Sequence, residues 1–134
     1  MISPAAGGRS TQEWIDKAEG DFISALTLYR ARKPPNYDTA CYHTQQCAEK
    51  YLKARLEEAG QPAPRTHNLY ALLTLIGEFE SSWKVMATDL NVLKAFAVVY
   101  RYPGATAAKE DAKDAIKRCR SIRRMFRFSF GLPL

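Results

Sequence analysis

Residues 37–60 read YDTACYHTQQCAEKYLKARLEEAG, and this stretch carries the helical pattern from which the fold class follows. Apolar and small side chains recur in it at intervals of three and four residues, which places them on one face of a helix. Asp38 can cap the start, and Gly60, with the prolines that follow it, can end the helix. We therefore expect a helix over about residues 38–59. Its buried face should consist of Cys41, Thr44, Ala48, Tyr51, Leu52 and Leu56.

Four other segments show the same spacing of apolar side chains. The first follows Ser10, which with Glu13 has the spacing of a capping box, and it stops at Pro34. The last two are separated by Pro103 and the glycine after it. The predicted helices cover residues 11–32, 69–79, 90–100 and 108–126.

The pattern indicates an all-α protein. No segment of useful length alternates apolar and polar residues, and no repeat of 20 to 50 residues is visible, so a sheet or a solenoid is not expected. Five amphipathic helices with short links favour an up-and-down helical bundle of about five helices. At 134 residues, 46% of them apolar, the chain has the size of one domain. We expect a flexible leader over 1–10, the bundle over 11–127 and a tail over 128–134.

Several classes of protein are excluded by what the sequence lacks. No run approaches the ~20 apolar residues of a membrane helix and no signal peptide is visible, so a cytoplasmic protein without membrane contact is expected. The three cysteines form no CxxC pair, and Cys41 and Cys47 should behave as small hydrophobic residues. Phosphate-loop, dinucleotide, metalloprotease and serine-hydrolase motifs are absent. We therefore predict no metal site, no cofactor and no catalytic residue.

A polar stripe runs beside the apolar face of the 38–59 helix. At about 100° per residue, His43, Gln46, Lys50 and Lys53 fall in one line, so they can present two cations, an amide and an imidazole to one anionic group. The alternative is an ordinary solvent-exposed face, in which Glu49 pairs with Lys53 four residues later. Both interpretations stay open from spacing alone.

A second candidate site is the segment YRYPG at residues 100–104. Aromatic rings can stack on a base while a guanidinium binds a phosphate, so Arg101 and Tyr102 are candidates for binding a nucleotide. Alternatively, Arg101 only caps carbonyls at a helix end. His67 lies in the proline-containing link before the 69–79 helix, where a local cap or turn is its ordinary role.

The predicted last helix carries most of the excess positive charge. Residues 1–104 hold 12 basic and 11 acidic side chains, whereas 105–134 hold 8 and 3. This surface could bind RNA phosphates, anionic lipid or an acidic protein, and a solvated charged face is the alternative. Acidic residues on the same helix are too few to pair with it, so the counter-charges must come from elsewhere. The stripe consists of Lys113, Lys117, Arg120, Arg124 and Arg127.

Three segments together resemble the HEPN domain family. They are ACYHTQQCAEKYLKARLEEAG at 40–60, THNLYALL at 66–73 and YRYPG at 100–104, and the resemblance extends from about Trp14 to Phe126. It implies a small helical bundle that forms a homodimer, binds a nucleotide or RNA, and is often paired with a minimal nucleotidyltransferase in a toxin-antitoxin-like arrangement. The positions that match the nucleotidyltransferase-associated branch are His43, Gln46, Glu49 and Lys50 in the helix and Arg101, Tyr102 and Pro103 after it.

Ribonucleases of this family use an arginine followed by a histidine after four to six residues, and that motif is absent here. The positions that would carry the histidine after Arg101 hold Thr106, Ala107 and Ala108. The leading hypothesis is therefore a non-catalytic nucleotide- or nucleic-acid-binding protein. One alternative is a divergent ribonuclease in which His43 or His67 converges on Arg101 after folding. Another is an assembly module that uses the basic last helix.

Overall fold

The computed structural model describes residues 9–32 and 34–134, and within these ranges it contains five α-helices, one 3-10 helix and no β-strand. The all-α helical bundle predicted from the sequence is thereby confirmed. Each predicted helix is present, with bounds within a few residues of those expected. The elements are α1 (Arg9–Arg30), α2 (Tyr37–Glu58), α3 (Leu69–Gly77), η1 (Ser81–Met86), α4 (Ala87–Val99) and α5 (Lys109–Ser129).

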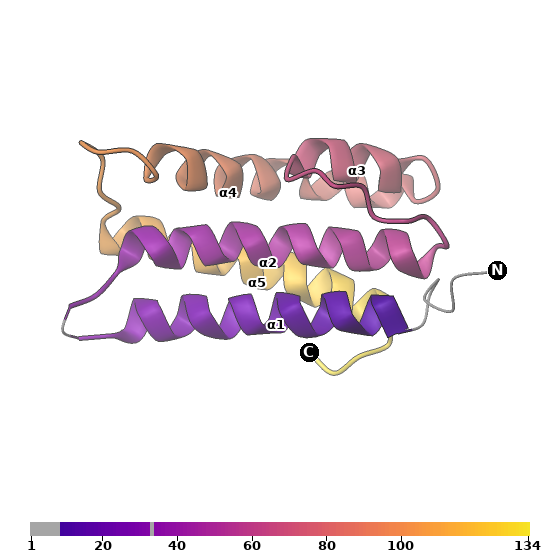
Figure 1. Cartoon of the computed structure of the whole chain (residues 1–134), viewed down its shortest axis with the longest axis horizontal. Helices are drawn as coiled ribbons and strands as arrows, with labels where there is room; N and C mark the ends of the chain where they lie inside the picture. Colours follow the sequence, from indigo (N-terminus) through magenta and orange to yellow (C-terminus); the bar gives the residue numbers. More distant parts are fainter. Residues whose placement is uncertain (1–8, 33) are drawn as a thin grey trace.

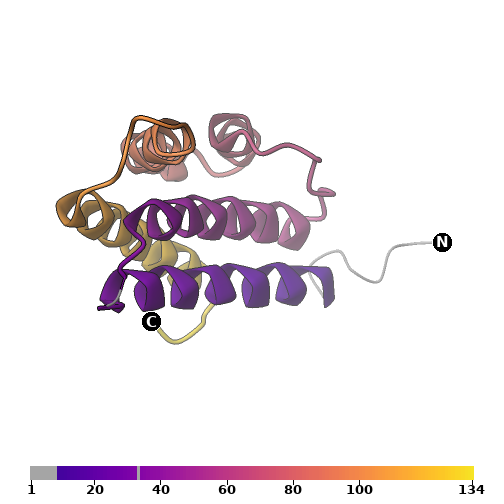
Figure 2. The same cartoon turned by 60° about the vertical axis from the view of Figure 1, so that its left-hand side comes forward.

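Helix α2 occupies the centre of the bundle (Figure 1). Helix α1 covers one side of it, α3 and α4 lie on the opposite side, and α5 lies behind it, as the turned view in Figure 2 also shows. The link between α2 and α3 runs back along the bundle, so that α3 begins beside the middle of α2 (Figure 1). This return brings a residue of the link, His67, to within hydrogen-bond distance of Glu49 on α2.

The starts of the helices differ in detail from the prediction. Helix α2 begins at Tyr37 and is capped by Asn36, whose side-chain oxygen accepts a hydrogen bond from the Thr39 N–H, and not by Asp38. Asp38 lies inside the first turn, where a carboxylate is favoured by the helix dipole, and it also accepts a hydrogen bond from the Ala107 N–H at 2.6 Å. It therefore joins the start of α2 to the link before α5.

Helix α1 begins at Arg9, so Ser10 lies inside the helix instead of capping it. Residues 1–8 of the predicted leader are outside the described residues. Before α3, Asn68 caps the helix by accepting a hydrogen bond from the Ala71 N–H. Satisfying such free N–H groups contributes about 1 kcal/mol at each helix start.

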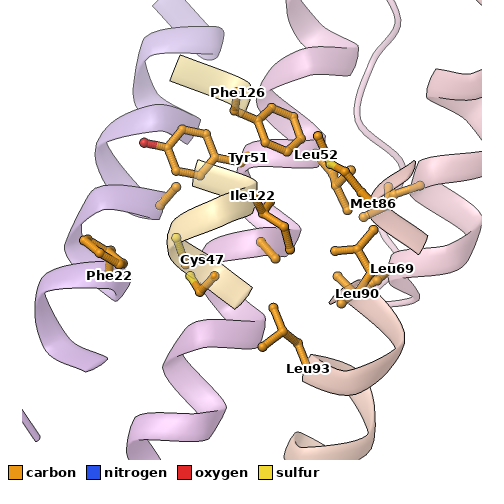
Figure 3. Packing of buried hydrophobic residues seen from close by; sticks show 14 of the residues in the cluster. Phe22, Cys47, Tyr51, Leu52, Leu69, Met86, Leu90, Leu93, Ile122 and Phe126 are labelled. Atoms are coloured by element: carbon orange, nitrogen blue, oxygen red, sulfur yellow. The ribbon is translucent and has the colours of Figure 1, made fainter. Parts of the chain in front are cut away.

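The core is built from all the helices, as Figure 3 shows. At its centre the Phe126 ring stacks on Tyr51 with centroids 5.4 Å apart and meets Trp83 edge-on at 4.5 Å. Trp83 and Met86 come from η1, a segment in which the apolar spacing gave no prediction. A 3-10 helix has three residues per turn, so its apolar positions do not follow the 3.6-residue period.

The three cysteines Cys41, Cys47 and Cys119 are free and fully buried. Burial raises the pKa of the Cys41 thiol to about 12, with the nearby carboxylates of Asp111 and Asp38 contributing in the same direction. The prediction that cysteines in the 38–59 helix act as small hydrophobic residues is confirmed. In the described part of the chain, no helix has both the length and the apolar composition that crossing a membrane requires.

Candidate functional site

A groove of about 440 Å³ opens between α2 and α4 and is closed at one side by the link before α3. We call it the α2–α4 groove. Its volume falls in the range of small-molecule sites. None of its lining side chains is acidic, and two are permanently cationic. They are Tyr42, Gln45 and Gln46 of α2, His67 of the link, Lys94, Ala97 and Val98 of α4, and Arg101 just after α4.

The cations of the α2–α4 groove come from one face of α4 and its end. Lys94 and Arg101 lie seven residues apart, with Ala97 and Val98 between them on the same face. Both charged side chains are exposed, and neither forms an ion pair with any residue in the described ranges. Arg101 makes no side-chain hydrogen bond to the carbonyls at the end of α4 either. The helix-end explanation considered for this arginine therefore has no support in the structure.

The imidazole in the α2–α4 groove is held by a buried carboxylate. The Nδ1 atom of His67 lies 3.1 and 3.0 Å from the two carboxylate oxygens of Glu49, and Glu49 is only 2% exposed. Lys53 donates to the same carboxylate at 3.1 Å, so the pair expected on a solvent-exposed face is present, but both of its residues are buried. Because Nδ1 is engaged with Glu49, the second ring nitrogen of His67 remains available to a ligand.

The α2 wall of the α2–α4 groove consists of two glutamines and a tyrosine. Gln45 is buried, as its place on the apolar side of the helix suggests, and its side-chain oxygen accepts a hydrogen bond from Gln46 at 2.8 Å. This bond orients the Gln46 amide across the wall. Tyr42 is 40% exposed and provides a flat ring beside the amides. Amides and a ring can recognise the edge and the face of a base.

Only one residue of the predicted polar stripe lines the α2–α4 groove. Gln46 does so, whereas His43 and Lys50 point at α1, where Asp21 binds the His43 Nδ1 at 2.8 Å and the Lys50 Nζ at 2.5 Å. The fourth member, Lys53, pairs with Glu49 and lies over the Trp14 ring, 5.3 Å from its centroid. His43 and Lys50 of the stripe thus bind one carboxylate, which belongs to the protein itself.

Neighbouring residues of the YRYPG segment have different contacts. The Tyr100 hydroxyl donates a hydrogen bond to the Asp111 carboxylate at 2.9 Å and thereby joins the end of α4 to α5. Arg101 lines the α2–α4 groove, while Tyr102 is 62% exposed and is not among the lining residues. Gly104 has a φ of +94°, a left-handed conformation that favours glycine, so the segment turns sharply after Arg101.

Glu19 of α1 binds two arginines of α5, namely Arg127 of the basic stripe and Arg123, which is not part of the stripe. The guanidinium of Arg123 binds both carboxylate oxygens of Glu19 at 2.7 Å, and Arg127 approaches the same carboxylate at 3.5 Å. Burial raises the pKa of Glu19, but the hydrogen bonds from Arg123 and Tyr51 and the two positive charges outweigh it, so the pKa lies below 4.5. The counter-charge that α5 lacks is supplied here by α1.

The other members of the stripe have different surroundings. Lys117 and Arg120 line a second groove between α1 and α5, and the Arg120 guanidinium lies 5.7 Å from the centroid of the Phe22 ring. Arg124 is exposed and has no ion-pair partner among residues 9–32 and 34–134. The four predicted nucleic-acid or partner-binding residues Lys117, Arg120, Arg124 and Arg127 therefore do not form one continuous free surface.

The sequence pattern missed several residues of the α2–α4 groove. Lys94 could have been found, because it lies seven residues, about two helical turns, before Arg101, which follows directly after the end of the helix. The approach of His67 to Glu49 carries no local signal, since it depends on how the link folds back. Within the described ranges no three His, Cys, Asp or Glu side chains gather into a group that could hold a metal ion.

These features define a small helical-bundle protein with a cationic, amide-walled groove on its surface. The sequence matches the model of the HEPN domain family over residues 11–128, which is most of the chain. The protein therefore belongs to the HEPN domain family.

Two solved structures are similar to the fold. The crystal structure of TT1696 from Thermus thermophilus gives a TM-score of 0.70 at 20% sequence identity, covering 87% of this chain and 94% of that chain. The crystal structure of ST0689, an archaeal HEPN homologue, gives a TM-score of 0.65 at 25% identity, covering 89% of this chain and 96% of that chain. No curated protein gives a significant match to the sequence.

Proposed function

We propose that this HEPN protein binds a phosphate-bearing ligand, a nucleotide or a segment of RNA, in the α2–α4 groove. The observation that carries the proposal is the presence of Lys94 and Arg101 in a concave site without any acidic lining residue. A phosphate between them would gain charge-assisted hydrogen bonds and would offset two cations that the protein leaves unpaired. The guanidinium offers several parallel donors, which suits the geometry of a phosphate.

The remaining lining residues suit the rest of such a ligand. The paired amides of Gln45 and Gln46 can bind the polar edge of a base, and the Tyr42 ring can stack on its face. His67 can donate to or accept from a sugar hydroxyl with its free ring nitrogen. In this proposal the site binds without cleaving, in keeping with the missing arginine-histidine motif.

The proposal extends to the assembly in which the protein works. The resemblance of Arg101, Tyr102 and Pro103 to the nucleotidyltransferase-associated branch supports a minimal nucleotidyltransferase as partner in a toxin-antitoxin-like pair. Exposed apolar side chains at or next to the α2–α4 groove support a homodimer, because a second copy would cover them. These side chains are Tyr42, Val98, Val99 and Tyr102.

Isothermal titration of the purified protein with ATP and with a short single-stranded oligoribonucleotide tests the proposal. Saturable binding is expected, and the Arg101→Ala variant should weaken it at least about tenfold, the value of one lost charge-assisted contact. The matched control is Arg32→Ala, which removes an exposed arginine from the link after α1. Absence of saturable binding, or equal binding by both variants, would contradict the proposal.

A second candidate function is cleavage of RNA in the same groove, and the hydrogen bond between His67 and Glu49 favours it. A carboxylate that holds one ring nitrogen prepares the other nitrogen to accept a proton. His67 could then take the proton of a 2′-hydroxyl, whose oxygen attacks the adjacent phosphorus while Lys94 and Arg101 hold the phosphate. The 5′-oxygen leaves and takes a proton from a water, and the remaining hydroxide takes the proton back from His67, so that a cyclic phosphate, a free 5′-hydroxyl and the original imidazole result.

The two candidates are separated by an RNA cleavage assay on the wild type and two histidine variants. If the protein is a ribonuclease, His67→Asn should abolish cleavage while His43→Asn retains it, because His43 points at α1. If the protein only binds, wild-type preparations leave the RNA intact. Activity that survives His67→Asn would rule out the catalytic role of this histidine.

A further inference from the structure

A second concave site, the α1–α5 groove, lies between the end of α1 and the first half of α5. It has a volume of about 370 Å³ and shares no residue with the α2–α4 groove. Its apolar lining is provided by Leu26 and Ile116, and Tyr29 adds an aromatic ring. All its charged lining residues are cations, namely Arg30, Lys113, Lys117 and Arg120.

The cations of the α1–α5 groove are not matched by carboxylates. None of the four forms an ion pair within the described ranges. Arg120 instead places its guanidinium over the Phe22 ring. Other arginines of the same helix are matched: Arg118 binds Asp114 and Asp89, and Arg123 binds Glu19. Within the described ranges, the α5 cations without a carboxylate partner thus include those of this groove and Arg124, while Arg118 and Arg123 are paired.

The spacing of these cations brings like charges close together, which destabilises the protein when no ligand is bound. Lys113 and Lys117 are four residues apart on α5, and Arg120 follows three residues later, so like charges are neighbours on the helix surface. The three positions span about 10 Å along the helix axis at 1.5 Å per residue. Arg30 faces them from the last turn of α1. A ligand with several negative charges would relieve this repulsion, whereas a single carboxylate would meet only part of it.

We propose that the α1–α5 groove is a second anion site, which takes two or more adjacent phosphate groups next to a flat ring. Either a nucleoside triphosphate or a stretch of RNA can supply this chemistry, with Tyr29 beside the ring and the four cations on the phosphates. The site is separate from the proposed function, because none of its residues lines the α2–α4 groove. The two proposals can therefore fail independently.

Inorganic tripolyphosphate is the first probe, since it contains the phosphates without a ring, and titration at low salt should show saturable binding. The Lys113→Glu/Lys117→Glu variant should lose at least about tenfold in affinity, because two attractive contacts become repulsive. The matched control is Lys17→Glu/Lys84→Glu, which changes the net charge equally at two exposed lysines outside the groove. Arg101→Ala serves as a comparison, because any tripolyphosphate bound in the α2–α4 groove would depend on Arg101, whereas the α1–α5 groove does not contain this residue.

Salt dependence and two further ligands complete the test. For the single-stranded oligoribonucleotide, four contacts between cations and phosphates predict that log K falls with log salt at a slope of about −3, or roughly −0.7 per contact. ATP and a single-stranded oligoribonucleotide distinguish the sources: tighter binding of ATP indicates a free nucleotide, and tighter binding of the oligomer indicates RNA. Arg30→Gln replaces an exposed cation of the groove by an uncharged side chain, and it serves as a second variant if the double charge reversal does not fold.

The proposal would be overturned if the Lys113→Glu/Lys117→Glu variant and the Lys17→Glu/Lys84→Glu control bound tripolyphosphate equally well. It would also be overturned if the wild type did not bind tripolyphosphate at low salt. Loss of binding in Arg101→Ala alone would assign the phosphates to the α2–α4 groove and would also overturn it. Loss in the groove variants with retention in Arg101→Ala supports two separate sites.

Discussion

Two carboxylates of this protein, Asp21 and Glu49, each bind one histidine and one lysine, but they do so in different surroundings. Asp21 lies on α1 and receives His43 and Lys50 from α2. Its two partners are about a quarter exposed, with side-chain values of 26% for His43 and 23% for Lys50. This cluster joins two helices that lie along each other, so its geometry is explained by packing alone.

The Glu49 cluster also joins a buried carboxylate to one lysine and one histidine, but its two partners differ sharply in exposure. Glu49 and Lys53 are buried, at 3% and 7% of their side-chain area, whereas the His67 imidazole is 84% exposed. The exposed ring lines the α2–α4 groove together with Arg101. The residue types alone therefore do not show which histidine lines a groove. Both imidazoles are held by a carboxylate, but only that of His67 is exposed in the α2–α4 groove beside cations.

The largest effect is expected from Glu49→Gln, which leaves the buried Lys53 ammonium without its counter-charge. Breaking a buried ion pair from one side costs about 3 kcal/mol or more in free energy of unfolding. Urea denaturation monitored by circular dichroism measures it. The control is the Glu49→Gln/Lys53→Met double variant, which removes both charges and should recover part of the loss. A double variant less stable than the single one would contradict this explanation.

Asp21→Asn should cost less, about 2 kcal/mol, because water can reach both of its former partners. Ligand binding in the α2–α4 groove should stay unchanged, since neither His43 nor Lys50 lines it. Thermal denaturation and the nucleotide titration together measure the two effects. A loss of binding without a loss of stability would show that the Asp21 cluster also serves the groove.

The histidines themselves give the sharpest version of the comparison. His43→Ala should cost about 1 kcal/mol of stability, the value of one hydrogen bond to a charged group in a partly exposed setting, and leave groove binding intact. His67→Ala should change stability by less than about 0.5 kcal/mol, as is usual for an exposed side chain, and weaken groove binding. Denaturation curves and groove binding are measured on both variants. A loss of groove binding in His43→Ala together with unchanged binding in His67→Ala would refute the distinction between the two histidines.

The smallest effect is expected in acid and concerns Glu19, a third carboxylate with cationic partners but no histidine. Its pKa is lowered in the folded protein, so its contribution to stability is present above the unfolded value of about 4.5 and is lost as pH falls through the lower folded value. The stability difference between wild type and Glu19→Gln should therefore shrink below about pH 4.5. Denaturation curves between pH 3 and pH 7 test this, and a constant difference would contradict it.

The helices could be predicted from the sequence because each buries one face, and that face has a local period. Gln45 on the apolar side and the pairing of Glu49 with Lys53 follow from the same geometry. The partners across helices could not be predicted. His43 and Lys50 share a stripe with Gln46, yet only tertiary packing decides that two of them meet Asp21 while the third lines a groove.

The candidate site was predicted only in part for the same reason. Arg101 and Gln46 were recognised from a motif and a helical position, and both line the α2–α4 groove. The contribution of His67 depends on a link that turns back along the bundle, for which residues 59–68 carry no periodic signal. The core contribution of Trp83 was missed because η1 does not follow the α-helical period.

The burial of all three thiols has a practical consequence. A thiol-alkylating reagent attacks the thiolate, and in the folded state all three thiols are inaccessible. Burial also raises the pKa of the Cys41 and Cys47 thiols, which disfavours their thiolate forms. Labelling of the native protein can therefore proceed only through opening of the bundle. The rate at which Cys41, Cys47 and Cys119 are modified therefore reports the rate or the extent of that opening, and mass spectrometry can measure it without any engineered probe.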